Sequence, residues 1–178
     1  MALDKPTLQD ALRDMFEGKP AFPSSKADAA ADLAAIYRAY AAGAAAATTI
    51  PVTVALTARA ATLTTDLEAA FTVAEEAGPP GVVALGIAMD TALVAFWTAM
   101  PFAFAGPPVI GGVVTLAPPL VLGPALTALF LAGAAGGPTA GQQAQGLATI
   151  LDAWTRTVTV VNTPITPPGP ATPPIPLT

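Results

Sequence analysis

The 178-residue sequence contains no cysteine and no histidine. Without cysteine there are no disulfides and no thiolate nucleophiles, and without histidine the side chain that titrates near neutral pH is missing. The two absences also remove the commonest ligands of transition metals. We therefore expect no metal, no cofactor and no enzymatic activity.

Charge is also scarce, since charged residues make up 11% of the chain against about a quarter in an ordinary soluble protein. The 61 residues between Asp90 and Asp152 carry no charged side chain, and no Lys or Arg lies between Arg59 and Arg156. A segment of this kind belongs in a membrane, in a protein core, or in an assembly whose other subunits cover it.

Six of the seven basic residues lie in the first third of the chain, at Lys5, Arg13, Lys19, Lys26, Arg38 and Arg59. They form no positive stripe that follows a phosphate backbone, which excludes nucleic acid as a direct partner. The apolar content of 53% excludes a disordered, solvating chain. The first residues have no secretory signal pattern, so we expect synthesis in the cytoplasm.

The first half of the sequence predicts three helices. The first begins at Thr7, with Asp10 as a weak capping partner, and ends before Gly18. The second is capped by Ser24 or Ser25 and reaches about Thr48. The third lies between Pro51 and Ala77 and has a seam of small and apolar side chains at heptad-like spacing, namely Leu56, Ala60, Leu63, Leu67, Ala70 and Ala74. The short connection predicts that the second and third helices pair antiparallel.

The second half predicts a helix over 81–100 interrupted by Asp90, and a helix over 125–135 with Pro124 as its first residue. A third helix follows a capping box formed by Thr139 and Gln142. Short strands are expected at 109–110, 113–114 and 158–161. The fold class is therefore mainly α, an Ala-rich antiparallel helical bundle over 1–162 with an extended Pro-rich tail over 163–178 that lies outside the core.

Three pairs of carboxylates resemble acid/base pairs only in spacing: Asp10 with Asp14, Asp28 with Asp32, and Glu75 with Glu76. Catalytic carboxylates need a pocket that separates their pKa values, and no partner residue indicates one. We interpret all three pairs as parts of solvated helix faces.

Asp90 is the unusual acid, because its neighbours Ile87, Met89, Leu93 and Val94 are apolar. A buried carboxylate is costly unless it is hydrogen-bonded or paired. Asp90 either faces a surface groove, or caps a helix that begins at Thr91, or pairs with Arg59 or Arg156 of a neighbouring subunit.

The aromatic cluster Phe96, Trp97, Phe102 and Phe104 is more typical of core or interface packing than of a ligand-binding box. An extended tail without charge suits docking along a neighbouring subunit. The candidate interface residues are Asp90, Phe96, Trp97, Phe102, Phe104, Trp154, Pro167, Pro168, Pro173 and Pro174.

The membrane alternative is a small integral membrane protein such as a holin-like lysis protein, spanning at 81–100 and imperfectly at 120–135. Against it, Asp90 would lie at the bilayer centre, and no Lys or Arg flanks either segment to set topology. The assembly interpretation explains the low charge, the small residues and the uncharged tail together.

Three segments, LQDALRDMFEG, ADLAAIYRAYAAG and LATILDAWTRTVTV followed by a Pro/Thr tail, resemble small Ala/Pro/Thr-rich structural proteins of tailed bacteriophages. The resemblance covers about a third of the chain and implies a virion component without catalytic residues. Its implied partners are further copies of itself, in a homo-oligomer within a larger assembly, and other virion proteins.

Overall fold

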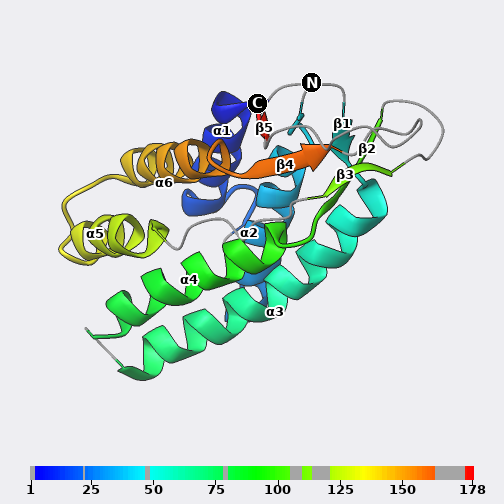
Figure 1. Ribbon diagram of the computed structural model, residues 1–178. Helices are drawn as coiled ribbons and strands as arrows, with labels where there is room; N and C mark the ends of the chain where they lie inside the picture. Colours follow the sequence, from blue (N-terminus) through cyan, green and yellow to red (C-terminus); the bar gives the residue numbers. More distant parts are fainter. Residues whose placement is uncertain are drawn as a thin grey trace, which may run out of the picture.

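The computed structural model describes residues 3–21, 23–46, 49–77, 80–104, 110–113, 121–162 and 175–178. The described part is mainly helical, which confirms the mainly α class predicted from the sequence (Figure 1). Its helices are α1 (Lys5–Phe16), α2 (Lys26–Ala41), α3 (Thr53–Ala77), α4 (Gly81–Trp97), α5 (Leu122–Ala134) and α6 (Ala140–Thr155). Its strands are β1 (Thr49–Pro51), β2 (Pro101–Phe104), β3 (Ile110–Val113), β4 (Thr159–Asn162) and β5 (Ile175–Pro176).

The helices contact one another in a closed circuit. Each one packs against the next along the chain, and α6 returns to α1. The most extensive packing between two helices is that of α3 against α4, which lie side by side (Figure 1). The circuit encloses a core with many alanines, so the helix backbones approach closely around a few large side chains.

Helix starts follow local capping chemistry. Ser25 accepts a hydrogen bond from the backbone N–H of Asp28 at the start of α2, and the capping box of Thr139 and Gln142 opens α6 as predicted. The first helix begins at Lys5 and not at Thr7, because Asp4 is its N-cap and accepts from the Thr7 N–H.

Two helix ends differ from expectation. The second helix ends at Ala41, well short of Thr48, because the chain turns and Ala46 and Thr49 bond each other's backbones before β1. The helix α4 ends at Trp97 and not at residue 100, since Ala99 takes a left-handed φ of 56° that turns the chain towards β2.

The predicted seam of α3 is confirmed. Five of its residues are buried, Leu56, Ala60, Leu63, Leu67 and Ala70, and Ala74 is half-buried. The helix contacts α2, as the short connection predicts, and also α4.

The five strands form one antiparallel sheet in the order β1-β2-β3-β4-β5. The strand β5 pairs with β4, and Leu177 beyond it is 2% exposed and belongs to the core. For residues 175–178 the expectation of a tail outside the core is therefore wrong, because this short segment completes the sheet.

Candidate functional site

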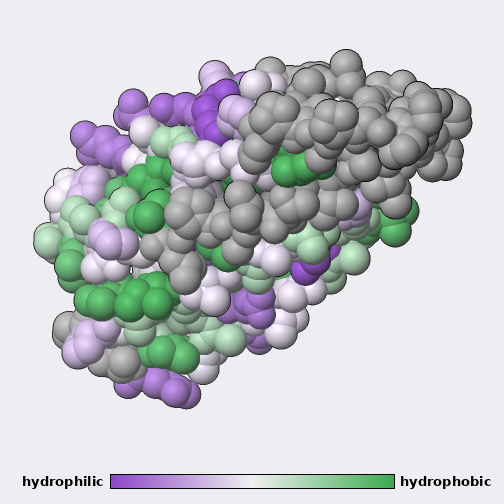
Figure 2. Space-filling model, viewed as in Figure 1, coloured by the Kyte–Doolittle hydropathy of each residue, from purple (hydrophilic) through white to green (hydrophobic). Residues whose placement is uncertain are grey.

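An uncharged groove runs between α4 and α5. It is a hollow of about 380 Å³ lined by Val83, Ile87, Gly123, Pro124, Thr127, Ala128 and Leu131. Three large apolar side chains of this lining are exposed to solvent: Ile87 is 58% exposed, Leu131 47% and Val83 46%. Figure 2 shows hydrophobic residues gathered on this end of the molecule. Exposed apolar side chains scattered singly are ordinary, whereas a contiguous group marks an interaction surface.

The groove exists because a glycine of α4, Gly86, lets the two helices touch. A Cβ added to Gly86 of α4 would lie 2.7 Å from the carbonyl oxygen of Gly123 and 2.3 Å from Thr127 Oγ1. No real side chain tolerates such a contact with backbone. The helices therefore meet backbone to backbone at Gly86, and the side chains on either side of the crossing form the walls.

Asp90 lies beneath this crossing and is 4% exposed. Its Oδ2 accepts a hydrogen bond of 3.0 Å from the backbone N–H of Gly123, in the first turn of α5. The N-cap residue of α5, Val121, provides no side-chain bond. Asp90 thus caps α5 from a neighbouring helix, where the positive end of the helix dipole favours a carboxylate.

Asp90 does not cap a helix beginning at Thr91, since α4 runs unbroken through both residues. Within this chain Arg59 donates to the carbonyl oxygens of Ala95 and Thr98, and Arg156 pairs with Asp152. The other oxygen of Asp90, Oδ1, is buried with no hydrogen-bond partner. Pairing with an arginine of another subunit stays a prediction.

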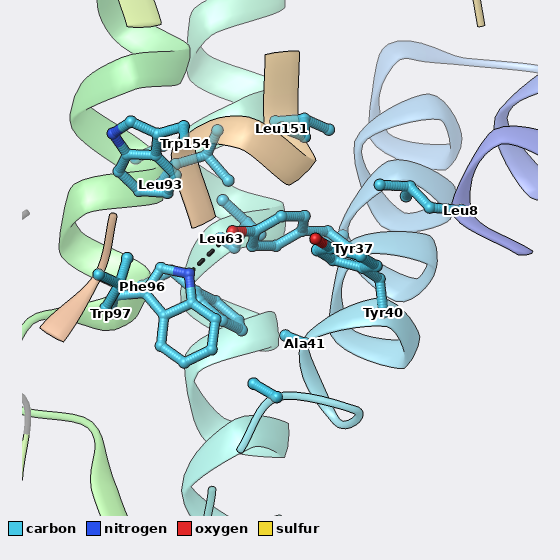
Figure 3. Packing of buried hydrophobic residues seen from close by; sticks show 14 of the residues in the cluster. Leu8, Tyr37, Tyr40, Ala41, Leu63, Leu93, Phe96, Trp97, Leu151 and Trp154 are labelled. Atoms are coloured by element: carbon cyan, nitrogen blue, oxygen red, sulfur yellow. Dashed lines mark hydrogen bonds between the residues drawn. The ribbon is translucent and has the colours of Figure 1, made fainter. Parts of the chain in front are cut away.

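The aromatic candidates lie in the interior. Phe96 and Trp97 meet edge to face at 5.3 Å between ring centroids, and the ring of Trp97 stacks on Phe102 at 6.4 Å. Trp154 of α6 is 3% exposed and faces the same core (Figure 3). Core packing and interface packing were both predicted for the aromatic cluster, and its members with described side chains, Phe96, Trp97 and Phe102, are buried in the core.

Tyr37 joins three helices through its hydroxyl. It accepts a hydrogen bond of 2.8 Å from the indole N–H of Trp97 (dashed in Figure 3) and lies 2.8 Å from Thr155 Oγ1. Burial raises the pKa of Tyr37 well above its ordinary value, and the bonds with Thr155 and Trp97 oppose the rise only in part. The hydroxyl therefore acts as a neutral structural link between α2, α4 and α6.

A second polar cluster lies at the edge of the core. Tyr40 donates to Asp152 Oδ1 at 2.7 Å, and Arg156 holds both oxygens of Asp152 at 3.0 Å. Partial burial alone raises the pKa of Asp152, but the bonds from Arg156 and Tyr40 together hold it below its ordinary range. Arg156 also donates to the backbone oxygen of Leu3, which ties the start of the chain to α6.

A larger hollow of about 620 Å³ lies between α1 and α2. Its lining includes four alanines together with Leu8, Ile36 and Tyr40. Asp4 at its rim is already used in capping α1. The Thr7 hydroxyl donates to Asp4 Oδ2 at 2.7 Å, so this pair is part of the cap of α1.

The carboxylate pairs lie on exposed helix faces, as predicted. Asp10 pairs with Arg13, Asp28 bonds Ser24, and Glu75 pairs with Lys26. Among the described residues no group of acidic side chains is arranged to hold a metal ion.

No helix in the described part of the chain combines the length and the apolar character needed to cross a bilayer. The longest, α3, has 25 residues and carries several charged side chains, and the apolar α4 has 17.

The other candidate interface residues have side chains outside the described part of the structure. Phe104 belongs to β2, but its side chain is not described, and Pro167, Pro168, Pro173 and Pro174 lie outside the described residues. The sequence reasoning missed Gly86 and the hydrogen-bonded roles of Tyr37 and Tyr40. A glycine inside an apolar helical pattern, and two tyrosines on a buried face, were the available signals.

No protein-family model, curated protein or solved structure matches this chain.

Proposed function

We propose that this chain is a non-enzymatic structural subunit of a bacteriophage or phage-derived particle, either a capsid decoration protein or a component of the neck, tail or baseplate. Its localisation is then the virion, and its partners are further copies of itself and other virion proteins. The observation that carries the proposal is the uncharged groove between α4 and α5, walled by Val83, Ile87 and Leu131.

The groove supports assembly for an electrostatic reason. The chain has a net charge of −5, so identical copies repel one another over most of their surfaces. The α4–α5 end carries no charged side chain in its lining. Subunits can approach there without burying like charges, and the exposed apolar area is removed from water on contact.

The resemblance to phage structural proteins supplies the kind of particle. The segments that carry it include much of α1, α2 and α6, which contribute to the core and do not line the α4–α5 groove. The membrane alternative gains no support from the described helices, none of which is suited to crossing a bilayer.

The test is fractionation of lysates that contain the particles. We expect the protein to co-sediment with intact particles through a density gradient at a fixed ratio to the other structural proteins. Recovery only at the top of the gradient, or only with detergent-extracted membranes, would contradict the proposal.

A matched pair of variants tests the surface itself. Ile87→Glu places a charge in the groove, and Val54→Glu places one at a side chain that is 80% exposed on α3. We expect Ile87→Glu to reduce incorporation by roughly tenfold or more, the effect of about 1.4 kcal/mol lost at each contact. Val54→Glu should incorporate normally; equal behaviour of the two variants would exclude the groove as the contact.

A further inference from the structure

The segment Ile175–Thr178 fills a slot between two parts of the chain that are far apart in sequence. On one side β5 pairs with β4, in the register Thr159 with Pro176 and Val160 with Ile175, and the Leu177 N–H donates to the Val158 oxygen at 3.0 Å. On the other side, Thr178 and Ala45 exchange two backbone hydrogen bonds of 3.0 and 3.1 Å.

The slot is built to hold a strand. Leu177 is buried, and so are Val158 and Val160 on the β4 side of the slot and Ala44 and Ala46 on either side of Ala45. Without a strand there, backbone groups of Ala45 and Val158 lose their partners and the site of Leu177 is empty. Unpaired backbone groups at a buried edge are costly, so the slot requires an occupant.

Nothing in these contacts requires that the strand come from the same copy. The connection between Asn162 and Ile175 has twelve residues, six of them proline. Because β4 and β5 are neighbouring antiparallel strands, its two ends lie roughly 8 Å apart. A sequence of this composition favours the extended polyproline II helix, which covers about 37 Å in twelve residues.

An extended connection would cover a much longer distance than the one between neighbouring strands. The composition of the connection therefore favours pairing of the strand with a second copy of the chain. We propose that two copies of this chain exchange the segment Ile175–Thr178, so that each inserts Leu177 into the slot of the other. The exchanged contacts are identical to those within one chain, which makes exchange a low-cost route to a dimer. This pairing is independent of the kind of particle to which the protein belongs.

The chain suits a disulfide test because it has no cysteine of its own. Two residues that exchange a pair of backbone hydrogen bonds have Cα atoms about 5.5 Å apart, within the range of a disulfide. Ala45→Cys and Thr178→Cys are made in separate full-length chains with tags of different size. The two chains are mixed in denaturant, refolded together and oxidised.

Exchange predicts a disulfide-linked heterodimer on a non-reducing gel. The control mixes Thr178→Cys with Ala58→Cys, an exposed position on α3, and reports chance collisions. We expect roughly tenfold more heterodimer than in the control, because a docked strand holds the two thiols at millimolar effective concentration.

The double variant Ala45→Cys/Thr178→Cys keeps the proposal open to refutation. If this variant forms only a disulfide within one chain, and the mixture gives no more heterodimer than the control, the strand stays in its own chain and the proposal is overturned. The readout uses purified protein, so it is unaffected by whether the protein is later found in phage particles.

Discussion

The two ends of α4 have the same kind of sequence and opposite surroundings. Near its start, Val83 and Ile87 are exposed beside α5, whereas near its end Phe96 and Trp97 are almost fully buried. Both ends are apolar, and Asp90 between them is the only charged residue of the helix. The comparison shows that a run without charge has no single meaning, because one helix can supply both the core and an apolar outer surface.

The two ends also differ in what fixes them. At the buried end, side chains from α2, α4 and α6 are joined by hydrogen bonds through Tyr37. At the exposed end, α5 is held by a backbone crossing at Gly86 and by the cap from Asp90. We therefore expect changes at the first end to unfold the whole domain, and changes at the second to release α5.

The largest expected effect is at the buried end. Trp97→Ala removes a side chain with 0% exposure and leaves Tyr37 without its donor, at a cost of about 3–5 kcal/mol in the free energy of unfolding. Urea unfolding measures the loss. The control Val54→Ala, at an exposed position, should change stability by less than about 0.5 kcal/mol. A loss at Trp97 as small as that of the control would remove the distinction between the two ends.

A smaller effect is expected at the crossing. Gly86→Ala forces a methyl group against the backbone of Gly123 and should cost about 1–3 kcal/mol, despite the better helix propensity of alanine. Gly141→Ala in α6 is the matched control, since the nearest atoms to its new Cβ are 4.0 Å away.

Hydrogen exchange resolves where Gly86→Ala acts. Amides of α5 should lose protection first, while those of α2 and α6 keep theirs. Uniform loss over all helices would mean that the crossing belongs to the same cooperative unit as the aromatic core.

The smallest effect is the response to acid at the edge of the core. Because the pKa of Asp152 is lowered in the folded state, its contribution to stability is complete above its ordinary value and is lost as the pH falls through the folded value. Arg156 is 43% exposed, so solvent screening limits the contribution to about 1 kcal/mol.

The measurement is urea unfolding at pH 7 and near pH 2. Asp152→Asn should lose less stability between the two conditions than the unmodified chain, and Tyr40→Phe, which removes one donor, should lie between them. If Asp152→Asn loses as much as the unmodified chain on acidification, the carboxylate is not held ionised by Arg156 and Tyr40.

Helix positions followed from local signals. The seam from Leu56 to Ala70, the capping box at Thr139 and the strand near Val160 could all be predicted, because spacing and capping are properties of neighbouring residues. The start of α1 at Lys5 was missed because two possible caps, Asp4 and Thr7, lay within one helical turn. The end of α2 was missed because alanine offers no stop signal of its own.

The candidate site was predictable only in outline. The sequence marked Asp90 as unusual, but its partner, Gly123, is 33 residues away. It marked the aromatic cluster around Trp97 without deciding between core and interface. Gly86 stood out as a glycine in an apolar helical pattern, but its role in setting the distance between α4 and α5 follows only once its neighbour is known.

By itself, then, the sequence determined that the chain is mainly helical, lacks the side chains for thiol or imidazole chemistry, and has a long uncharged half. Only the tertiary structure decided which parts of that half are interior and which are surface, and that Leu177 belongs to the core. The physical reason is that the hydrophobicity of a side chain determines how much free energy is gained when it is buried. Which surface covers it depends on long-range contacts that no local pattern records.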